Sequence, residues 1–397
     1  MGCDQNVAEL GGPILSGLRV VEMSAFIAAP LGGACLAELG ADVIRIDPPG
    51  GGIDIARWPL HEGRSLYWAG LNQGKRSVTI DLRTETGRRQ AAGIITAPGE
   101  GGGIFLTNLP SAKWRSFDEL SKRRPDLIMV LITGGRRGGT AVDYTVNAEL
   151  GFPYITGPEG HVGPVNHVLP AWDAMTGFLA ATAILAAERH RRATGQGQQV
   201  ELSLADVGLA VAGHLGYLAE AQLTKEPRGR YGNYVFGTFG RDFETKDRRS
   251  VMVLALTPRQ WTALSDATGL GPRFAEIETR AGADLSAEGD RWRFRHDIAA
   301  LLESWIGNRD LTEVGDAFET AGVLWAPYRT FQDFAASDAL RSMPEDFAGQ
   351  VDHPGLGRYW TVGSPLRFSR NESMPPRPAP ELGQHTDEVL AEFGLAD

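Results

Sequence analysis

Apolar and polar positions in the first part of the chain follow the pattern of strands and helices in alternation. Leu18–Met23 and Asp42–Ile46 are mainly apolar runs, each typical of a buried strand. Between them Pro30 opens a helix that runs to Leu39, and Gly40 ends it, the usual asymmetry of proline at the start and glycine after the end. This order predicts a right-handed βαβ unit, which begins a parallel sheet.

The same alternation continues through most of the chain. Further apolar strands are expected at Val78–Leu82, Ile104–Thr107 and Leu127–Ile132, with a helix beginning at Asp118. A long apolar helix is expected after Pro170, followed by a strand and a helix that opens at Ala205. Strands that alternate with helices in this way predict an α/β fold, with a Rossmann-like large domain built on a parallel sheet.

A change of composition divides the chain. The segment Lys225–Arg230 is charged and contains a proline and a glycine, as a linker does. A strand at Ser250–Ala255 and further helices come after it. We therefore expect a smaller α+β domain at residues 226–330, and a large domain formed by residues 1–225 and 331–397.

The composition excludes several classes of protein. A hydrophobic content of 42% is typical of a globular enzyme, and a net charge of −10 disfavours a nucleic-acid or membrane surface. Two cysteines provide no disulfide framework. The N-terminus lacks the pattern of a signal peptide, and the apolar run from Gly177 to Ala187 is too short to cross a bilayer. These features predict a cytoplasmic protein.

Asp173 stands where the long helix is expected to begin, directly after Trp172. An Asp at a helix start is most often an N-cap, whose carboxylate accepts a hydrogen bond from a backbone amide. The same position also fixes and partly desolvates a carboxylate beside an indole, which is what a carboxylate nucleophile requires. Position alone favours the cap and leaves the second role open.

Two basic loops are candidates for binding an anion. Lys75 and Arg76 precede a strand, where they are either solvated loop charges or a clamp on phosphate groups. Arg136 and Arg137 have two glycines on each side, so backbone amides and guanidinium groups face an anion there, or the loop is simply a surface loop. His385 has no other His or Cys at metal-binding spacing, so we expect a cap or packing role and no metal site.

Several longer motifs belong together. They are Gly17–Glu22, Leu39–Asp47, Asn72–Ser77, Trp172-Asp173 with Gly177, Thr194–Gln199 and Leu382–Leu390. In combination they resemble CoA-transferase family III over nearly the whole chain. The resemblance implies that Asp173 is the nucleophile that accepts the acyl group, that the substrate is an acyl-CoA, and that two chains form a homodimer interlocked as rings.

The resemblance also implies which residues contact CoA, which is part of the substrate and not a separate cofactor. They are Phe26, Ile27, Ala28, Lys75, Arg76, Asn108, Leu109 and Arg115. A substrate that keeps a free carboxylate remote from CoA needs a cation to hold it. The candidates are Arg136, Arg137 and Arg241, the last of which follows an aromatic, glycine-spaced segment.

Within the family, the chain is most similar to a branch that moves CoA within one molecule, between the two carboxyl groups of the unsaturated C5 dicarboxylate mesaconate. Ile27 stands where the oxalate-specific members have Gln, and no run of consecutive glycines follows Tyr231. Val142 replaces the histidine of the racemases in the family, and valine cannot transfer a proton. The alternatives are an intermolecular transferase, passing CoA from a donor such as succinyl-CoA to a dicarboxylic acid, and a non-catalytic acyl-CoA-binding protein.

Overall fold

The computed structural model describes residues 12–136 and 140–396, which form two compact units. The larger unit consists of the chain up to Leu150, Val168–Gln222 and the chain from Asp338. The smaller unit consists of Gly151–His167 and Leu223–Ser337.

The segment 151–167, which the sequence analysis left in the large domain, groups with the smaller unit. Hydrogen bonds attach it there: Gly232 donates its amide to the Gly157 carbonyl at 3.0 Å. The Arg230 guanidinium donates to the carbonyls of Tyr154 and Pro153, at 2.8 and 3.1 Å.

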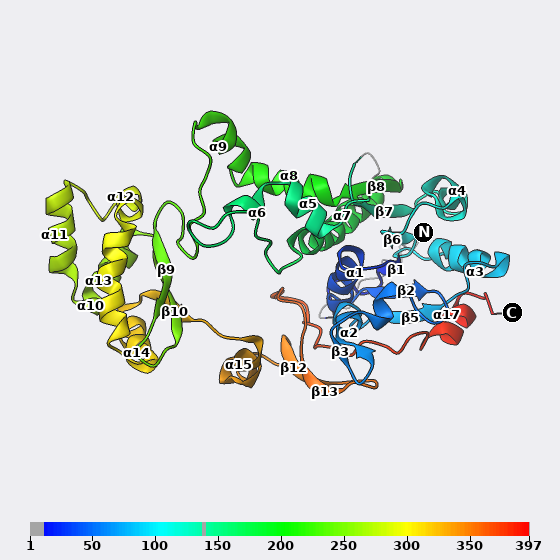
Figure 1. The fold of residues 1–397 in the computed structure, drawn as a ribbon. Coiled ribbons are helices and arrows are strands. Elements are labelled where there is room, and N and C mark those ends of the chain that lie inside the picture. Colours follow the sequence, from blue (N-terminus) through cyan, green and yellow to red (C-terminus); the bar gives the residue numbers. More distant parts are fainter. Residues whose placement is uncertain (1–11, 137–139, 397) are drawn as a thin grey trace. The chain divides into compact units, whose positions relative to one another are not determined.

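Within the described residues, a six-stranded parallel sheet forms the centre of the larger unit, in the order β5-β2-β1-β6-β7-β8 (Figure 1). Its strands are β1 (Arg19–Met23), β2 (Asp42–Asp47), β5 (Arg76–Thr79), β6 (Ile104–Thr107), β7 (Ile128–Thr133) and β8 (Gln198–Ser203). The α/β class and the parallel sheet expected from the sequence are confirmed. Strand β5 begins two residues earlier than expected, because Arg76 already lies opposite Ile44 of β2.

Helices and two small hairpins complete the larger unit. The helices are α1 (Ala28–Glu38), α2 (Leu66–Leu71), α3 (Glu85–Thr96), α4 (Phe117–Ser121), α5 (Asp143–Glu149), α7 (Ala171–Thr194), α8 (Leu204–His214), α9 (Tyr217–Leu223), α16 (Asp338–Arg341) and α17 (Thr386–Glu392), with the short 3-10 helices η1 (Ile53–Ala56) and η2 (Lys113–Arg115). The hairpins pair β3 (Leu60–His61) with β4 (Arg64–Ser65), and β12 (Ala348–His353) with β13 (Gly357–Val362).

Helices cover both faces of the parallel sheet, since successive side chains of each strand point to opposite faces. On one face, Val21, Ile44 and Phe105 belong to an apolar cluster that includes residues of α3, α4 and α17. On the other face α1 packs against β6: a Cβ added at Gly32 would lie 3.5 Å from the Leu106 side chain. Helix α1 also packs along α7.

The end of the chain returns to the edge of the sheet. Thr386, the first residue of α17, accepts a hydrogen bond from the Thr79 amide at 2.9 Å. The Nδ1 atom of His385 accepts the Ser77 amide at 3.1 Å, which ties the helix start to β5. His385 therefore contributes to packing at this edge, in agreement with the expected role.

The smaller unit is built on a three-stranded antiparallel sheet in the order β11-β10-β9. Its elements are α6 (Phe152–Ile155), β9 (Phe239–Glu244), β10 (Ser250–Ala255), α10 (Pro258–Thr268), α11 (Gly271–Ala281), α12 (Glu288–Arg293), α13 (Arg295–Gly307), α14 (Leu311–Ala321), β11 (Leu324–Pro327) and α15 (Phe331–Ala336). Phe243, Val253 and Phe318 pack in its core. Searched over the described residues, neither unit contains a helix with the length and apolar character needed to span a bilayer.

Candidate active site

Helix α7 begins at Ala171, so Asp173 is the third residue of its first turn. The N-cap position is held by Pro170, which has no side-chain acceptor for the free amides of the turn. The N-cap role considered for Asp173 is therefore wrong, because the helix begins two residues before it.

Asp143, at the start of α5, caps α7 from outside the helix. Its Oδ2 atom accepts hydrogen bonds from the amides of Trp172, at 2.7 Å, and Asp173, at 3.0 Å. The first turn of a helix favours a carboxylate because its amides are unpaired and the helix dipole is positive there. Nothing in the sequence marked Asp143, since the helix that it caps lies far along the chain.

Asp173 is partly buried in this turn. Burial first, and then the negative charge of Asp143, raise the pKa of Asp173 from a usual value of 3.8 to about 6, and the positive charge of Arg57 opposes them. A carboxylate with this pKa is still mainly ionised at neutral pH, and it is a stronger nucleophile than an ordinary aspartate.

Gly177 lies four residues after Asp173 in α7, at a place where α7 packs closely against α1. A Cβ on Gly177 would lie 2.8 Å from the Ala28 carbonyl oxygen and 3.0 Å from the Leu31 Cβ. From the other side, a Cβ on Gly32 would lie 3.0 Å from the Gly177 carbonyl oxygen. Two glycines thus let α1 and α7 approach closely, which brings the start of α1 beside the first turns of the helix that carries Asp173.

The loop before α1 is held in a fixed conformation by side chains from two other loops. Asn108 accepts the Ala25 amide at 2.9 Å and donates to the Ala25 carbonyl at 2.6 Å. Asp54 accepts the Phe26 amide at 2.9 Å. Phe26 has φ 62°, in the left-handed region that non-glycine residues rarely adopt, so these bonds compensate a strained backbone.

Arg57 and Tyr67 are near Asp173 and were missed by the sequence analysis. The Arg57 guanidinium lies over the rings of Phe26 and Tyr67, at 5.2 and 5.1 Å from their centroids. The charge of Asp173 is one cause that raises the pKa of Tyr67, after burial, which is the largest, and Asp54. In the part of the chain that the structure describes, the Arg57 guanidinium forms no ion pair. The buried hydroxyl of Tyr67 has no hydrogen-bond partner among the same residues. No motif or spacing indicated either residue.

Lys75, expected to bind CoA phosphate, is placed in a buried charge network instead. Its ammonium group donates to Glu22 at 2.9 Å, to the Pro30 carbonyl at 2.8 Å and to Asn72 at 3.1 Å, and its side chain is 0% exposed. Burial lowers the pKa of Lys75 to about 8. All three donors are used, so the geometry gives no support to a direct contact of Lys75 with a phosphate.

The same network reaches the loop before α1. Arg45, which is 1% exposed, forms bonds with Asp47 at 2.8 Å and is 3.6 Å from Asp54, the acceptor of the Phe26 amide. Buried charges that are paired and hydrogen-bonded in this way specify one arrangement of the elements that carry them. The network therefore connects β1, β2 and η1 to the loop that precedes α1.

Three other predicted CoA contacts, Arg76, Arg115 and Leu109, are half-buried in the larger unit. Arg76 is 19% exposed and pairs with Asp42, at 2.5 Å, and with Glu392, at 2.6 Å. Arg115 donates to the Pro110 carbonyl and lies beside the Trp114 ring. The Leu109 amide donates to the Thr107 hydroxyl at 3.2 Å. Arg76 is thus engaged with carboxylates, whereas Arg115 has only a neutral acceptor.

The structure describes two of the three arginines proposed for a free carboxylate, one in each unit. Arg136 is exposed and pairs with Asp206 at 2.9 Å. Arg137 lies outside the described residues. Arg241 belongs to the smaller unit, where it pairs with Glu303 at 3.0 Å and donates to the Tyr234 hydroxyl at 3.2 Å.

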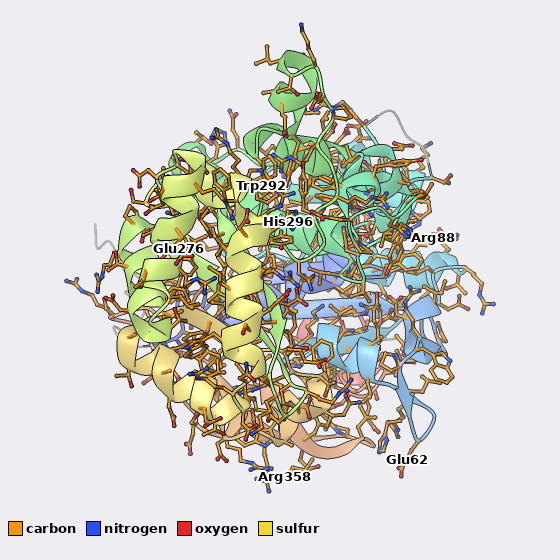
Figure 2. The ribbon with its side chains drawn as sticks, turned by 60° about the vertical axis from the view of Figure 1, so that its left-hand side comes forward. Glu62, Arg88, Glu276, Trp292, His296 and Arg358 are labelled. Carbon is orange, nitrogen blue, oxygen red and sulfur yellow. The ribbon has the colours of Figure 1, made fainter. Side chains whose placement is uncertain are left out.

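Arg241 also lines a groove of the smaller unit together with Tyr231 and Tyr234. Aromatic rings from the adjoining ends of α12 and α13 pack beside it: Trp292 on Tyr231, with centroids 4.8 Å apart, and His296 on Tyr234, at 5.3 Å (Figure 2). An aromatic wall beside an arginine suits a planar or anionic ligand.

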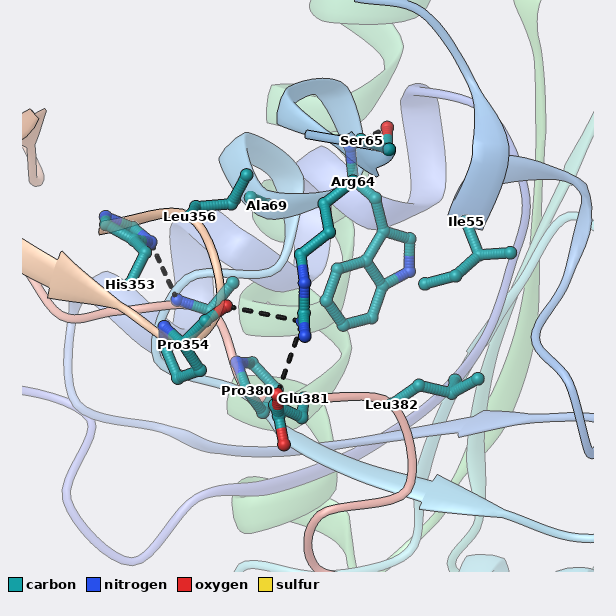
Figure 3. A pocket seen from close by; sticks show the side chains of 13 residues that line it. Ile55, Arg64, Ser65, Ala69, His353, Pro354, Leu356, Pro380, Glu381 and Leu382 are labelled. Carbon is teal, nitrogen blue, oxygen red and sulfur yellow. Dashed lines mark hydrogen bonds and ion pairs between the residues drawn. The ribbon is translucent and has the colours of Figure 1, made fainter. Parts of the chain in front are cut away.

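A separate cavity of about 220 Å³ opens in the larger unit between α2 and the hairpin of β12 and β13 (Figure 3). Its polar groups pair with one another: Arg64 with Glu381 at 3.2 Å, and His353 with the Ala379 amide at 3.4 Å. Its lining includes neither Asp173 nor any predicted site residue. The cavity therefore does not mark the reactive site.

Comparisons with known proteins agree with this geometry. Residues 15–386 match the family described as CoA-transferase family III. The chain is also similar to a crystal structure of a CAIB/BAIF family protein from Brucella suis, with a TM-score of 0.79 and 25% identity over 96% of this chain and 100% of that one. The chain therefore belongs to CoA-transferase family III.

Among curated relatives, 2-methylfumaryl-CoA isomerase from Chloroflexus aurantiacus is 54% identical over 97% of this chain and 95% of that protein. Succinyl-CoA:mesaconate CoA-transferase from Haloarcula marismortui is 28% identical over 96% of this chain and 96% of its own length. The similarity to the isomerase is thus far greater than the similarity to the intermolecular enzyme.

Proposed function

We propose that this chain is an isomerase that moves CoA from one carboxyl group of 2-methylfumarate (mesaconate) to the other, from the C1 thioester to the C4 thioester. The observation that carries the proposal is the 54% identity, over 97% of the chain, to a 2-methylfumaryl-CoA isomerase. The position of Asp173 supports it, because the transfer needs a carboxylate nucleophile in a partly desolvated place.

The transfer takes four displacements. A carboxylate oxygen of Asp173 attacks the C1 thioester carbonyl and expels the CoA thiolate, which leaves a mixed anhydride. The thiolate attacks the aspartyl carbonyl, giving an aspartyl-CoA thioester and releasing mesaconate within the site. The C4 carboxylate of mesaconate attacks that thioester and again expels thiolate, which attacks the C4 carbonyl and restores Asp173.

Each displacement passes through a tetrahedral oxyanion, which fixed N–H groups stabilise. The first turn of α1 is a source of such groups, since it starts beside α7, and the preceding loop is fixed by Asp54 and Asn108. We infer that Phe26, Ile27 and Ala28 line the thioester position, and that Arg115 and Leu109 contact the remainder of CoA.

Arg57 is the cation that we assign to the free carboxylate of the substrate. Arg136 and Arg241 already pair with carboxylates of their own units. The guanidinium of Arg57 lies between two aromatic rings, and its charge acts on Asp173. A planar guanidinium held in this way binds a carboxylate with two parallel hydrogen bonds.

We also propose that two chains form the interlocked homodimer of the family. Large apolar side chains on α7 and α8 support an additional interface, because they face solvent in a single chain. Met175 is 40% exposed, Phe178 56% and Leu209 47%. Large exposed apolar side chains of this kind are typical of an association face where they lie together. Native mass spectrometry would give the mass of two chains, and a monomer that turns over normally would contradict the proposal.

One assay tests the function. Purified mesaconyl-C1-CoA is incubated without any acceptor acid, and the two regioisomers are separated by chromatography. We expect the C4 thioester to accumulate with no free acid added. The substitution Asp173→Ala is expected to abolish turnover while CoA-thioester binding persists, and normal turnover in this variant would contradict the mechanism.

The intermolecular alternative has one observation in its favour, the 28% identity to a succinyl-CoA:mesaconate CoA-transferase. Labelled mesaconate added during turnover distinguishes the two reactions. An intramolecular enzyme incorporates label slowly, because the acid stays in the site. Incorporation as fast as isomerisation would show exchange with free acid, and would favour the intermolecular reaction.

A further inference from the structure

Asp143 holds α7 from a neighbouring helix, at the turn that carries the nucleophile. Its Oδ2 atom accepts two consecutive amides, those of Trp172 and Asp173, at 2.7 and 3.0 Å. Because Pro170 is the N-cap residue, α7 contributes no side-chain cap of its own in the described structure. One carboxylate oxygen therefore satisfies both amides.

A second contact from α5 fixes the same turn. The indole N–H of Trp172 donates to the Asn147 side chain at 3.3 Å, and Trp172 is 3% exposed. A Cβ on Gly208 of α8 would lie 3.3 Å from the indole ring, so α8 closes the other side of the ring. The first turn of α7 is thus anchored through its backbone and through Trp172, and Asp173 has little freedom to move.

Asp143 also has one carboxylate oxygen without a partner in the described structure. The residue is 2% exposed, and its second oxygen, Oδ1, is buried without a hydrogen-bond partner in the described part of the chain. Leaving a buried carboxylate oxygen unsatisfied is costly. Capping of the two amides needs only one acceptor oxygen, so the second oxygen and its share of the charge are left to act on the neighbouring Asp173.

We propose that Asp143 is a positioning residue for the nucleophile: it fixes the first turn of α7 and places a second negative charge beside the Asp173 carboxylate. Two charged groups act on that carboxylate, Asp143 of α5 and Arg57 after η1. Of these only Asp143 both contacts the nucleophile's backbone and carries a like charge.

The like charge makes Asp173 a stronger base and a stronger nucleophile. Asp143 is the second cause, after burial, of the raised pKa of Asp173. Two neighbouring carboxylates resist sharing the charged state. This inference rests on the proposed role of Asp173, since a positioning residue has meaning only if that carboxylate reacts.

The test is the acid limb of kcat/KM for mesaconyl-C1-CoA, measured for the full-length protein. Asp143→Asn keeps an oxygen that can accept both amides but removes the charge. The limb, set by ionisation of Asp173, is expected to move to lower pH by roughly one unit. Asp143→Ala removes both functions and is expected to lower kcat by at least about tenfold at every pH.

Glu149→Gln is the matched control, since Glu149 is exposed at the far end of α5. Its pH profile is expected to match the wild type. Thermal unfolding of each variant establishes that it is folded. If Asp143→Asn does not fold, Asp143→Ser provides a second neutral variant with an acceptor oxygen.

An unmoved acid limb in a folded, neutral variant would overturn the proposal, because Asp143 would then be only a structural cap. Full activity of Asp143→Ala would overturn it as well. Failure of the proposed function is recognised separately: in that case the wild-type protein forms no C4 thioester without added acid, or Asp173→Ala itself retains turnover, whatever the Asp143 variants do.

Discussion

Replacing the proposed nucleophile by its neutral isostere, Asp173→Asn, is expected to stabilise the protein while it abolishes turnover. The carboxylate oxygens of Asp173 accept no hydrogen bond from the described residues, and burial is the main cause that raises the pKa of this group to about 6. The ionised form is thus disfavoured in the folded state. An asparagine amide fills the same space without that electrostatic penalty.

The size of the effect follows from the two pKa values, 3.8 unfolded and about 6 folded. Because the folded value is the higher, the folded state binds more protons between them, and stability falls as the pH rises through this window. Each pH unit between the two values corresponds to ~1.4 kcal/mol, so the full penalty above pH 6 is ~3 kcal/mol. At pH 4 less than ~1 kcal/mol remains.

Guanidinium unfolding at pH 4, 6 and 8 measures this difference between wild type and Asp173→Asn. One protein concentration is used throughout, because a dimer unfolds in a concentration-dependent way. Since two units need not unfold together, the free energy is taken from the transition that the substitution displaces. Asp338→Asn is the control: its side chain is 98% exposed, so it should change the free energy of unfolding little.

A gain in stability that grows from pH 4 to pH 8 is the expected result. An equal effect at all three pH values, or a loss of stability at pH 8, would refute the reasoning. Either outcome would mean that the folded protein does not disfavour the charged form of Asp173, and that its reactivity must have another origin.

Three further outcomes are expected. Lys75→Met removes one of the two cations that pair with the buried Glu22 and leaves Arg45 as the other, so unfolding measurements should show a loss of roughly 1–3 kcal/mol with little change in KM; a raised KM in an equally stable protein would restore a phosphate contact. Gly177→Val places a Cβ 2.8 Å from the α1 backbone, and should lower both Tm and kcat, whereas Gly213→Ala in α8, with its nearest neighbour at 3.8 Å, should leave both unchanged. Arg115→Ala should raise KM for the acyl-CoA at nearly constant kcat, and an unchanged KM would remove Arg115 from the CoA site.

Local sequence signals predicted the backbone of the larger unit well. The apolar runs, with Pro30 and Gly40 at the ends of a helix, were sufficient for the β1–α1–β2 unit and for the parallel sheet. These signals are reliable because they depend on burial and backbone geometry over a few residues. The family motifs likewise identified the class of enzyme, and they made Asp173 the candidate nucleophile because the motif surrounds that residue in the chain.

The groups that act on Asp173 could not be read from the sequence. Asp143, Arg57 and Tyr67 are distant from Asp173 in the chain. Residues of these types usually have only a structural role or face solvent. Lys75 and Arg76 carried a motif typical of a phosphate clamp, yet Lys75 is buried on Glu22. A sequence motif indicates that a residue has a role, but it does not show whether the residue binds a ligand or pairs with a carboxylate of the protein.

The sequence by itself thus determined the sheet, the helix that carries the proposed nucleophile and the class of chemistry. Only the tertiary structure decided that α7 begins at Ala171, that Asp143 accepts the amides of its first turn, and that Gly177 brings α1 against it. The physical reason is that hydrophobic periodicity is encoded along the chain, whereas the pKa of a carboxylate depends on burial and on charges within a few ångströms in space.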